Sequence, residues 1–214
     1  MTKKADNQLM IRNITIEDLQ AISGIHLRAF PDSALSKLGL EAVRRYYHWQ
    51  LTGPHESHSI IALNNQKIVG FCFAGVFHGA LGGFLRKNQT FLVRRVISRP
   101  WLLFNELFRV RILSALRSLK IIPRKKIKSQ PSPNKKLKIY GILSIAVDPQ
   151  IQSRGVGRAL MKAAEQDAID KGFEQMGLTV SPKNLQAINF YTGLGWVKKG
   201  DPWAGSMIKN LAKK

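Results

Sequence analysis

The stretch from residue 139 to residue 171 constrains the fold most strongly. Residues 139–147 are apolar and predict a buried β-strand, whereas the spacing of apolar residues over 154–171 predicts a helix. A short polar loop joins the two, and Gly155 and Gly157 open the helix. Unpaired N–H groups and the helix dipole converge at such a turn, which suits it to bind a phosphate. The stretch therefore predicts an α/β protein with an anion-binding turn.

The rest of the chain alternates between helical and strand patterns. Helices are expected at 19–30, 36–50, 84–97, 100–119 and 185–192, strands at 59–63, 67–75, 174–180, 196–197 and 206–208, and a mobile loop at 124–136. This order predicts a mixed α/β chain built around one sheet. We expect a single domain over residues 9–210, with a basic helical insertion at 79–138.

The charge of the chain is concentrated in that insertion. The chain has 34 lysine and arginine residues against 13 acidic residues, a net charge of +21. Residues 86–138 hold 16 of the basic residues and one acidic residue, Glu106. The single cysteine, Cys72, excludes an internal disulfide framework and a cysteine-rich zinc site. It lies in an apolar run, so we expect a buried hydrophobic residue, and no metal site is predicted.

Three interpretations of the basic segment stay open. Its helices could cover the sheet, with the charged side chains in solvent. The helices within 85–119 could instead lie at an anionic membrane surface, where Trp101, Phe104 and Phe108 would insert. The charge could also bind RNA or an acidic protein, although no nucleic-acid-binding motif accompanies it.

Two motifs carry the chemistry. The first is Gln152-x-x-Gly155-x-Gly157, which lacks the Lys-Ser/Thr of a P-loop and the third glycine of a dinucleotide fingerprint. The second, at 184–196, reads Asn-Leu-Gln-Ala-Ile-Asn-Phe-Tyr-Thr-Gly-Leu-Gly-Trp. The two motifs in this order resemble the GNAT superfamily of N-acetyltransferases over residues 139–199, and the helix–helix–hairpin before them matches its amino-terminal half.

The resemblance implies a GNAT-like acyl-CoA N-acyltransferase fold with splayed central strands, and acetyl-CoA as the co-substrate. An amine, or a hydroxyl, would attack the thioester directly in a ternary complex. Tyr191 would act as the acid near the sulfur, and the N–H of Val147 would stabilise the oxyanion. The residues implied to hold the cofactor are Ile145, Ala146, Val147, Gln152, Ser153, Arg154, Gly155, Val156, Gly157, Arg158, Asn184, Asn189 and Tyr191.

The general base is not evident. Many members of the superfamily carry a Glu on the strand equivalent to 139–147, whose polar side chains here are Tyr140 and Ser144. A water chain or a residue from another loop could take the proton, and the acceptor stays undecided between an amine and a hydroxyl. The candidate bases are Glu41, Glu56, His26 and His78. Asp32, Ser33 and Ser36 lie at a junction that helps to wall the acceptor site in the superfamily and could contact the acceptor, although Asp32 or Ser33 could equally be a helix cap.

The location of the protein is expected to be cytoplasmic, with the inner face of a membrane as an option. Residues 1–8 lack the apolar stretch of a signal peptide. Residues 68–85 are nearly uncharged, but a central strand followed by a glycine-rich turn explains them better than a membrane span. The alternative function is a non-catalytic acyl-CoA-fold protein that acts as a membrane- or nucleic-acid-binding module through its basic insertion.

Overall fold

The computed structural model describes residues 9–101, 139–151 and 155–211 and contains one seven-stranded mixed sheet. The strands are β1 (Leu9–Asn13), β2 (Glu56–Asn64), β3 (Lys67–Val76), β4 (Tyr140–Val147), β5 (Gln175–Thr179), β6 (Val197–Lys198) and β7 (Ser206–Asn210). The helices are α1 (Leu19–Ala29), α2 (Ala34–Leu38), α3 (Leu40–Thr52), α4 (Ala80–Lys87), α5 (Gln89–Ile97), α7 (Val156–Asp170) and α8 (Leu185–Thr192), with a 3-10 turn at Pro149–Ile151. The expected mixed α/β class is confirmed.

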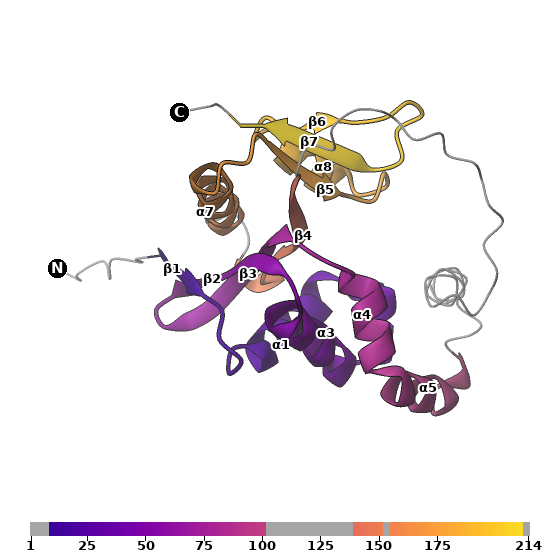
Figure 1. The fold of residues 1–214 in the computed structure, drawn as a ribbon. Coiled ribbons are helices and arrows are strands. Elements are labelled where there is room, and N and C mark those ends of the chain that lie inside the picture. Colours follow the sequence, from indigo (N-terminus) through magenta and orange to yellow (C-terminus); the bar gives the residue numbers. More distant parts are fainter. Residues whose placement is uncertain (1–8, 102–138, 152–154, 212–214) are drawn as a thin grey trace.

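The sheet has two buried faces. Its strand order is β1-β2-β3-β4-β5-β7-β6, and every neighbouring pair is antiparallel except β4 and β5. Alternate residues of β2 face opposite sides, so Ile61 packs with α1 and α3, whereas Ile60 packs with α7. In Figure 1, β4 links the part that holds β1–β3, α1 and α3 with the part that holds β5–β7.

The sheet opens between β4 and β5. Only Tyr140–Ile142 of β4 pair with β5, so the rest of β4 keeps its other neighbour, β3, and diverges from β5. A register shift in the β3–β4 ladder falls between Phe73 and Ala74, close to this point. The splayed central strands expected from the resemblance are therefore present.

The helix α7 lies close against the sheet. Val156, Leu160 and Ala164 follow one another at helical spacing and are buried. A Cβ on Gly70 of β3 would lie 3.1 Å from Val156 Cγ1 and 3.2 Å from Leu160 Cδ1. The absence of a side chain at Gly70 thus lets the helix approach the strand.

Three elements differ from the sequence prediction. The strand β1 was not predicted; it pairs with β2 at the edge of the sheet. The helix expected at 36–50 is divided into α2 and α3 by Gly39, whose φ of 96° a helix does not accommodate. The helix expected at 84–97 is divided at Asn88, whose Nδ2 donates to the Phe84 carbonyl at 3.0 Å. The helix and loop expected at 100–119 and 124–136 lie almost wholly outside the described residues.

The start of the basic segment packs on the rest of the domain. Gly83 is so close to Trp49 that a Cβ there would lie 2.2 Å from the indole, and the neighbouring Phe84 is buried. The guanidinium of Arg95 donates to the Leu38 carbonyl at 2.8 Å, and that of Arg99 to the Lys37 carbonyl at 3.0 Å. No helix in the described part of the chain is long and apolar enough to cross a bilayer.

Candidate functional site

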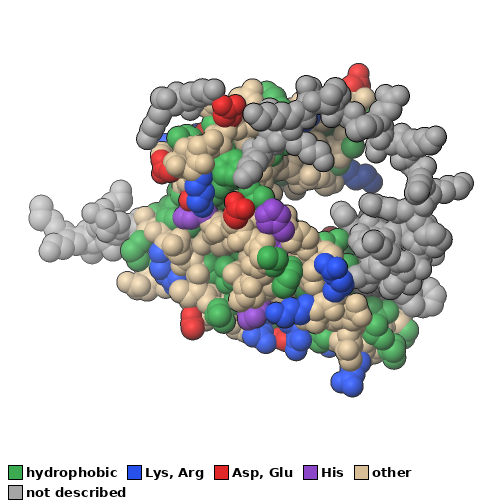
Figure 2. All heavy atoms as spheres, viewed as in Figure 1, with side chains coloured by type: hydrophobic (Ala, Val, Ile, Leu, Met, Phe, Trp, Pro, Cys, Tyr) green, Lys and Arg blue, Asp and Glu red, His purple; other side chains and the backbone are tan. Residues whose placement is uncertain are grey.

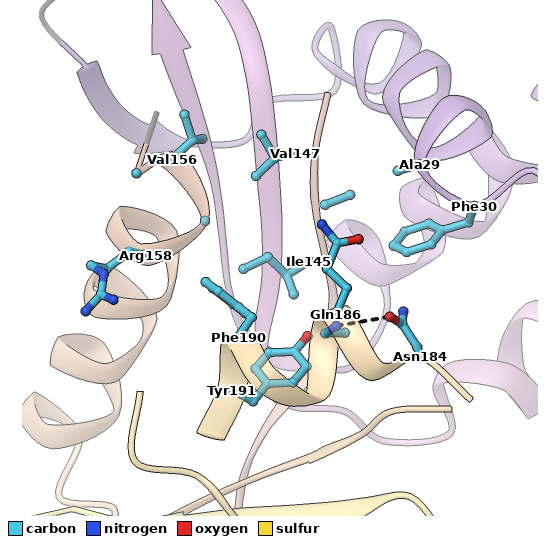
Figure 3. Close-up of a pocket in the computed structure, with 14 residues that line it drawn as sticks. Ala29, Phe30, Ile145, Val147, Val156, Arg158, Asn184, Gln186, Phe190 and Tyr191 are labelled. Atoms are coloured by element: carbon cyan, nitrogen blue, oxygen red, sulfur yellow. Dashed lines mark hydrogen bonds between the residues drawn. The ribbon is translucent and has the colours of Figure 1, made fainter. Parts of the chain in front are cut away.

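The opening between β4 and β5 forms a pocket of about 420 Å³ (Figure 3). It is bounded by the end of α1, the second half of β4, the first turn of α7 and the helix α8. The lining residues are Ala29, Phe30, Ile145, Ala146, Val147, Gly155, Val156, Gly157, Arg158, Asn184, Gln186, Ala187, Phe190 and Tyr191. The pocket brings the two sequence motifs together, although about 30 residues separate them in the chain.

The open edge of β4 supplies backbone hydrogen-bonding groups to the pocket. The N–H of Asp148 donates to the Val69 carbonyl of β3 at 2.8 Å. Because successive N–H groups of a strand point to opposite edges, those of Val147 and Ile145 point away from β3, toward the opening. These groups meet no strand there, so an extended ligand can pair with them as a strand would.

The first turn of α7 closes one side of the pocket. Gly155 caps the helix in the left-handed conformation (φ 75°), and a Cβ on Gly157 would lie 3.3 Å from the Phe190 ring. Arg158 belongs to the same turn, but Figure 3 shows its guanidinium directed away from Phe190 and Tyr191. Gln152, Ser153 and Arg154 lie outside the described residues. The first N–H groups of a helix have no partner within it, so this turn presents donors at the pocket.

The helix α8 closes the opposite side. The Asn184 side chain caps the helix by accepting from the Ala187 N–H at 3.0 Å, and it lines the pocket as well. Asn189, the other predicted asparagine, is exposed and is not among the lining residues. Phe190 and Gln186 line the pocket and were not predicted as site residues. Gln186 stands at a variable position of the second motif, whereas Phe190 stands at a position that the motif restricts to Phe or Leu, which marks an apolar residue but not its place in the pocket.

Tyr191 presents its hydroxyl to the pocket (Figure 3). Its ring is buried beside Trp196, and in Figure 3 its hydroxyl points into the pocket toward the side of Ile145. Burial raises the pKa of Tyr191 to about 12. The hydroxyl therefore carries its proton throughout the neutral range and is available as a donor.

An ion pair holds the residue that follows β4, Asp148, against α1. The Asp148 carboxylate is almost fully buried and accepts from the Arg28 guanidinium at 2.7 Å. Its other oxygen accepts from the Gln150 N–H at 3.2 Å. The Arg28 hydrogen bond holds the pKa of Asp148 below its usual value. This pair joins the chain just after β4 to the end of α1, which supplies Phe30 to the pocket.

The four candidate bases lie in different places. Glu41 is paired with Arg44 and Arg45 on the surface of α3. Glu56 is exposed, with His78 Nε2 at 3.7 Å. Only His26 is connected to β4, through hydrogen bonds that include the Tyr47 hydroxyl.

The polar residues at the junction of α1 and α2 form hydrogen bonds and an ion pair within that segment. Ser33 caps α2 by accepting from the Ser36 N–H at 3.0 Å, and the exposed Asp32 pairs with Lys37 at 2.9 Å. Their contact with an acceptor stays a prediction. Cys72 is buried as expected, and no group of three described residues is arranged to hold a metal ion.

The buried His26 makes folding stability depend on pH. Burial lowers the pKa of His26 from 6.5 to about 4, so between these two pH values the imidazole is protonated in the unfolded chain and neutral in the folded chain. The contribution is complete above pH 6.5 and is lost as the pH falls toward 4. By urea denaturation, wild type should lose about 2–3 kcal/mol more than His26→Gln between pH 7.5 and pH 4.5. Equal losses would contradict this assignment.

Comparison with known sequences agrees with this geometry. The sequence pattern of the acetyltransferase (GNAT) family matches residues 19–196. N-acetyltransferase 8B of Rattus norvegicus is 31% identical over 74 residues, which cover 35% of this chain and 32% of that protein. The match thus spans about a third of the length of this curated relative.

Solved structures share the fold at low sequence identity. The PaiA N-acetyltransferase of Thermoplasma acidophilum, solved with coenzyme A, superimposes with a TM-score of 0.57 at 13% identity over 95% of this chain and 99% of that one. The putative acetyltransferase YncA of Salmonella typhimurium, solved with acetyl-CoA, superimposes with a TM-score of 0.55 at 16% identity, over 97% of this chain and 96% of that one. Because the family pattern covers most of its length, the chain belongs to the acetyltransferase (GNAT) family.

Proposed function

We propose that this protein transfers the acetyl group of acetyl-CoA to an amine in a ternary complex. The observation that carries the proposal is the pocket itself, where the open edge of β4, the first turn of α7 and the Tyr191 hydroxyl face one space. The alternative of a non-catalytic binding module gains no support from this arrangement or from the family.

The pocket suits each part of acetyl-CoA. The first turn of α7 offers unpaired N–H groups and the positive end of its dipole to the pyrophosphate. Gly157 has no side chain that would keep a phosphate away from the helix backbone. Arg158 is the one charged residue among the described lining residues, and its charge is positive. The amide groups of the pantetheine arm would pair with Ile145 and Val147 at the open edge of β4.

The reaction then needs two groups near the thioester. The N–H of Val147 would donate to the carbonyl oxygen as negative charge develops on it. The amine nitrogen bonds to the carbonyl carbon, the C–S bond breaks, and the departing thiolate accepts a hydrogen bond from the Tyr191 hydroxyl. The thiol proton comes from this hydroxyl, which solvent reprotonates. Because burial raises the pKa of Tyr191 above the reference thiol pKa of about 8.5, the hydroxyl acts first as a hydrogen-bond donor to the thiolate, and its proton moves only as it is replaced from solvent.

A thiol-release assay tests the proposal. The protein is mixed with acetyl-CoA and a panel of primary amines, polyamines, peptide amino termini and sugars, and free CoA is measured against the protein-free rate. Acceptor-dependent release, with an acetylated product seen by mass spectrometry, is expected for at least one amine. Binding of acetyl-CoA without transfer to any member of the panel would contradict amine acetylation.

We also propose that the start of the basic segment binds an anionic membrane surface. Val93, Ile97 and Trp101 follow at intervals of four and are 57%, 72% and 61% exposed. The neighbouring Arg86 and Arg94 are also exposed, and none of the residues of α5 is buried. In Figure 2, basic side chains gather around α3 and α4 and exposed apolar ones lie at α5. Apolar side chains beside cations favour the boundary between headgroups and acyl chains.

Flotation with vesicles tests this second proposal. The protein should float with phosphatidylserine-containing vesicles and not with phosphatidylcholine alone. Replacing Val93, Ile97 and Trp101 by serine should reduce the floated fraction several-fold, whereas Ile16→Ser, a control whose side chain is 53% exposed, should leave it unchanged. If wild type does not float, or if the triple serine variant floats as well as Ile16→Ser, the proposed membrane-binding surface is contradicted. Binding of RNA without binding of vesicles would contradict it too.

A further inference from the structure

A chain of hydrogen bonds crosses the layer between β4 and the junction of α1 and α2. The Ser144 hydroxyl of β4 lies 2.8 Å from the Tyr47 hydroxyl of α3, which lies 2.8 Å from His26 Nδ1 of α1. On the other side of the imidazole, Nε2 lies 3.4 Å from the Ser33 hydroxyl. The Ser33 hydroxyl donates to that of Ser36 at 2.8 Å, and Ser36 donates to the Phe30 carbonyl at 2.6 Å.

The last bond sets the direction of all the others. A carbonyl oxygen only accepts, so the single proton of the Ser36 hydroxyl goes to Phe30, and Ser33 must donate to Ser36. The single proton of Ser33 is then committed, which leaves Nε2 of His26 as the donor to Ser33. Because a neutral imidazole has one donor and one acceptor nitrogen, Nδ1 of His26 accepts.

The direction continues to β4. Since Nδ1 accepts, the Tyr47 hydroxyl donates to it, and the Ser144 hydroxyl in turn donates to Tyr47. The Ser144 oxygen is thereby left with lone pairs that none of these hydrogen bonds uses. Every proton in the chain points away from β4, so the Ser144 oxygen is the accepting end of the chain.

Burial closes the middle of this chain and leaves its two ends partly exposed, at Ser33 and Ser36 and at Ser144, and Ser144 is the end that lies on β4. Tyr47 is fully buried and His26 is 7% exposed, whereas Ser144 is partly exposed. Ser144 follows Ile142, the last residue of β4 that pairs with β5, and precedes Ile145, which lines the pocket. A proton can therefore enter the chain at the divergence of β4 and β5, and not from the core.

We propose that Ser144, Tyr47 and His26 relay the proton that leaves the acceptor nitrogen. This rests on the proposed transfer from acetyl-CoA. As the C–N bond forms, the nitrogen proton passes to the Ser144 oxygen, the Ser144 proton passes to Tyr47, and the Tyr47 proton passes to Nδ1 of His26. The imidazole becomes imidazolium, and the proton returns along the same chain to solvent once the product has left.

The strength of the base fits the step. Burial lowers the pKa of His26 to about 4, so the imidazole is neutral and able to accept at neutral pH. An amine nitrogen becomes strongly acidic when it bonds to a carbonyl carbon, so a weak base suffices at that stage. The low pKa also drives the proton out again, which resets the chain for the next turnover.

Tyrosine-to-phenylalanine variants at neighbouring positions of α3 separate relay from packing. Tyr47→Phe keeps the ring that stacks on Phe73 at 4.5 Å but cuts the chain in the middle. Tyr46→Phe is the matched control, since the adjacent Tyr46 packs against Tyr47 and Phe84 and is not a member of the chain. The probe acceptor is hydroxylamine, which is small and must also lose a nitrogen proton as its C–N bond forms.

The relay predicts a loss in turnover and not in binding. Tyr47→Phe and Ser144→Ala should each lower kcat for thiol release by at least ~10-fold, because general acid–base catalysis contributes roughly 10²–10⁴-fold. The Kd of acetyl-CoA should stay within about twofold, and Tyr46→Phe should match wild type. The double variant should be no slower than either single one, since both cut the same chain. Full activity of Tyr47→Phe, or additive losses, would overturn the relay.

A measurement without turnover keeps the two proposals separate. The ring ¹⁵N shifts of His26, assigned by comparison with His26→Gln, should show a proton on Nε2 and none on Nδ1 at pH 7. A proton on Nδ1 would overturn the relay whatever the activity is. Failure of wild type to bind acetyl-CoA would instead overturn the proposed function, and the tautomer would still report on the hydrogen-bond chain.

Discussion

Replacing Tyr191 by phenylalanine is expected to lower kcat by about 10²-fold or more while acetyl-CoA still binds. The variant keeps the ring that packs beside Phe190 and Trp196 and removes the proton that the thiolate would take. Because the pKa of Tyr191 is raised to about 12, the wild-type hydroxyl is protonated at every pH used in the assay. Steady-state thiol release and calorimetric binding of acetyl-CoA measure the two effects separately.

The control for Tyr191→Phe is again Tyr46→Phe, which removes a tyrosine hydroxyl outside the pocket. The two variants should have equal thermal stability within a few degrees if Tyr191 acts mainly in the reaction. Unchanged turnover in Tyr191→Phe would remove this residue from the acid role. A loss of acetyl-CoA affinity equal to the loss in kcat/KM, with kcat unchanged, would assign Tyr191 to binding alone.

Replacing Gly157 by aspartate is expected to weaken acetyl-CoA binding by at least ~100-fold, equivalent to about 2.7 kcal/mol. The new carboxylate would stand at the first turn of α7, where the pyrophosphate is proposed to lie, and like charges repel strongly in a partly enclosed site. A Cβ at this position would meet Phe190 at a tight 3.3 Å and Val147 at 3.7 Å, so the fold should persist with a small shift of the Phe190 ring. Calorimetry at fixed salt measures the change in Kd.

Two further variants at the same position separate charge from bulk. Gly157→Asn has nearly the shape of aspartate without its charge, and Gly157→Ala adds only the Cβ. We expect the order of affinity to be glycine, alanine, asparagine, aspartate, with the largest step between the last two. An asparagine variant as weak as the aspartate variant would show that bulk, and not phosphate repulsion, is responsible.

The site was largely predictable from the sequence because its parts are local. The strand β4, the helix α7 and the motif at 184–196 each follow from patterns within about 15 residues. The side of the pocket formed by α1 was less evident, since Ala29 and Phe30 lie more than a hundred residues before β4 in the chain. No local pattern distinguishes a helix end that lines a pocket from one that meets solvent.

The hydrogen-bond chain shows where sequence reasoning stops. His26 and Ser144 were both noted as polar residues, yet Tyr47 joins them only because α1, α3 and β4 pack at one place. The break at Gly39 is similar: apolar residues continue at helical spacing through it, yet its φ is 96° and a Cβ there would lie 2.8 Å from Arg95 Nη2, a residue far along the chain. The edge strand β1 was missed because five residues hold too little alternation to identify a strand.

Calorimetric titration of acetyl-CoA into the wild-type protein tests the central claim most directly. The pocket between β4, α7 and α8 predicts saturable binding of one acetyl-CoA per chain, competed by CoA and abolished or strongly weakened in Gly157→Asp. The same ligand should raise the unfolding temperature of wild type and not of that variant. Absence of heat and of thermal stabilisation in wild type, or equal binding by wild type and Gly157→Asp, would contradict the account.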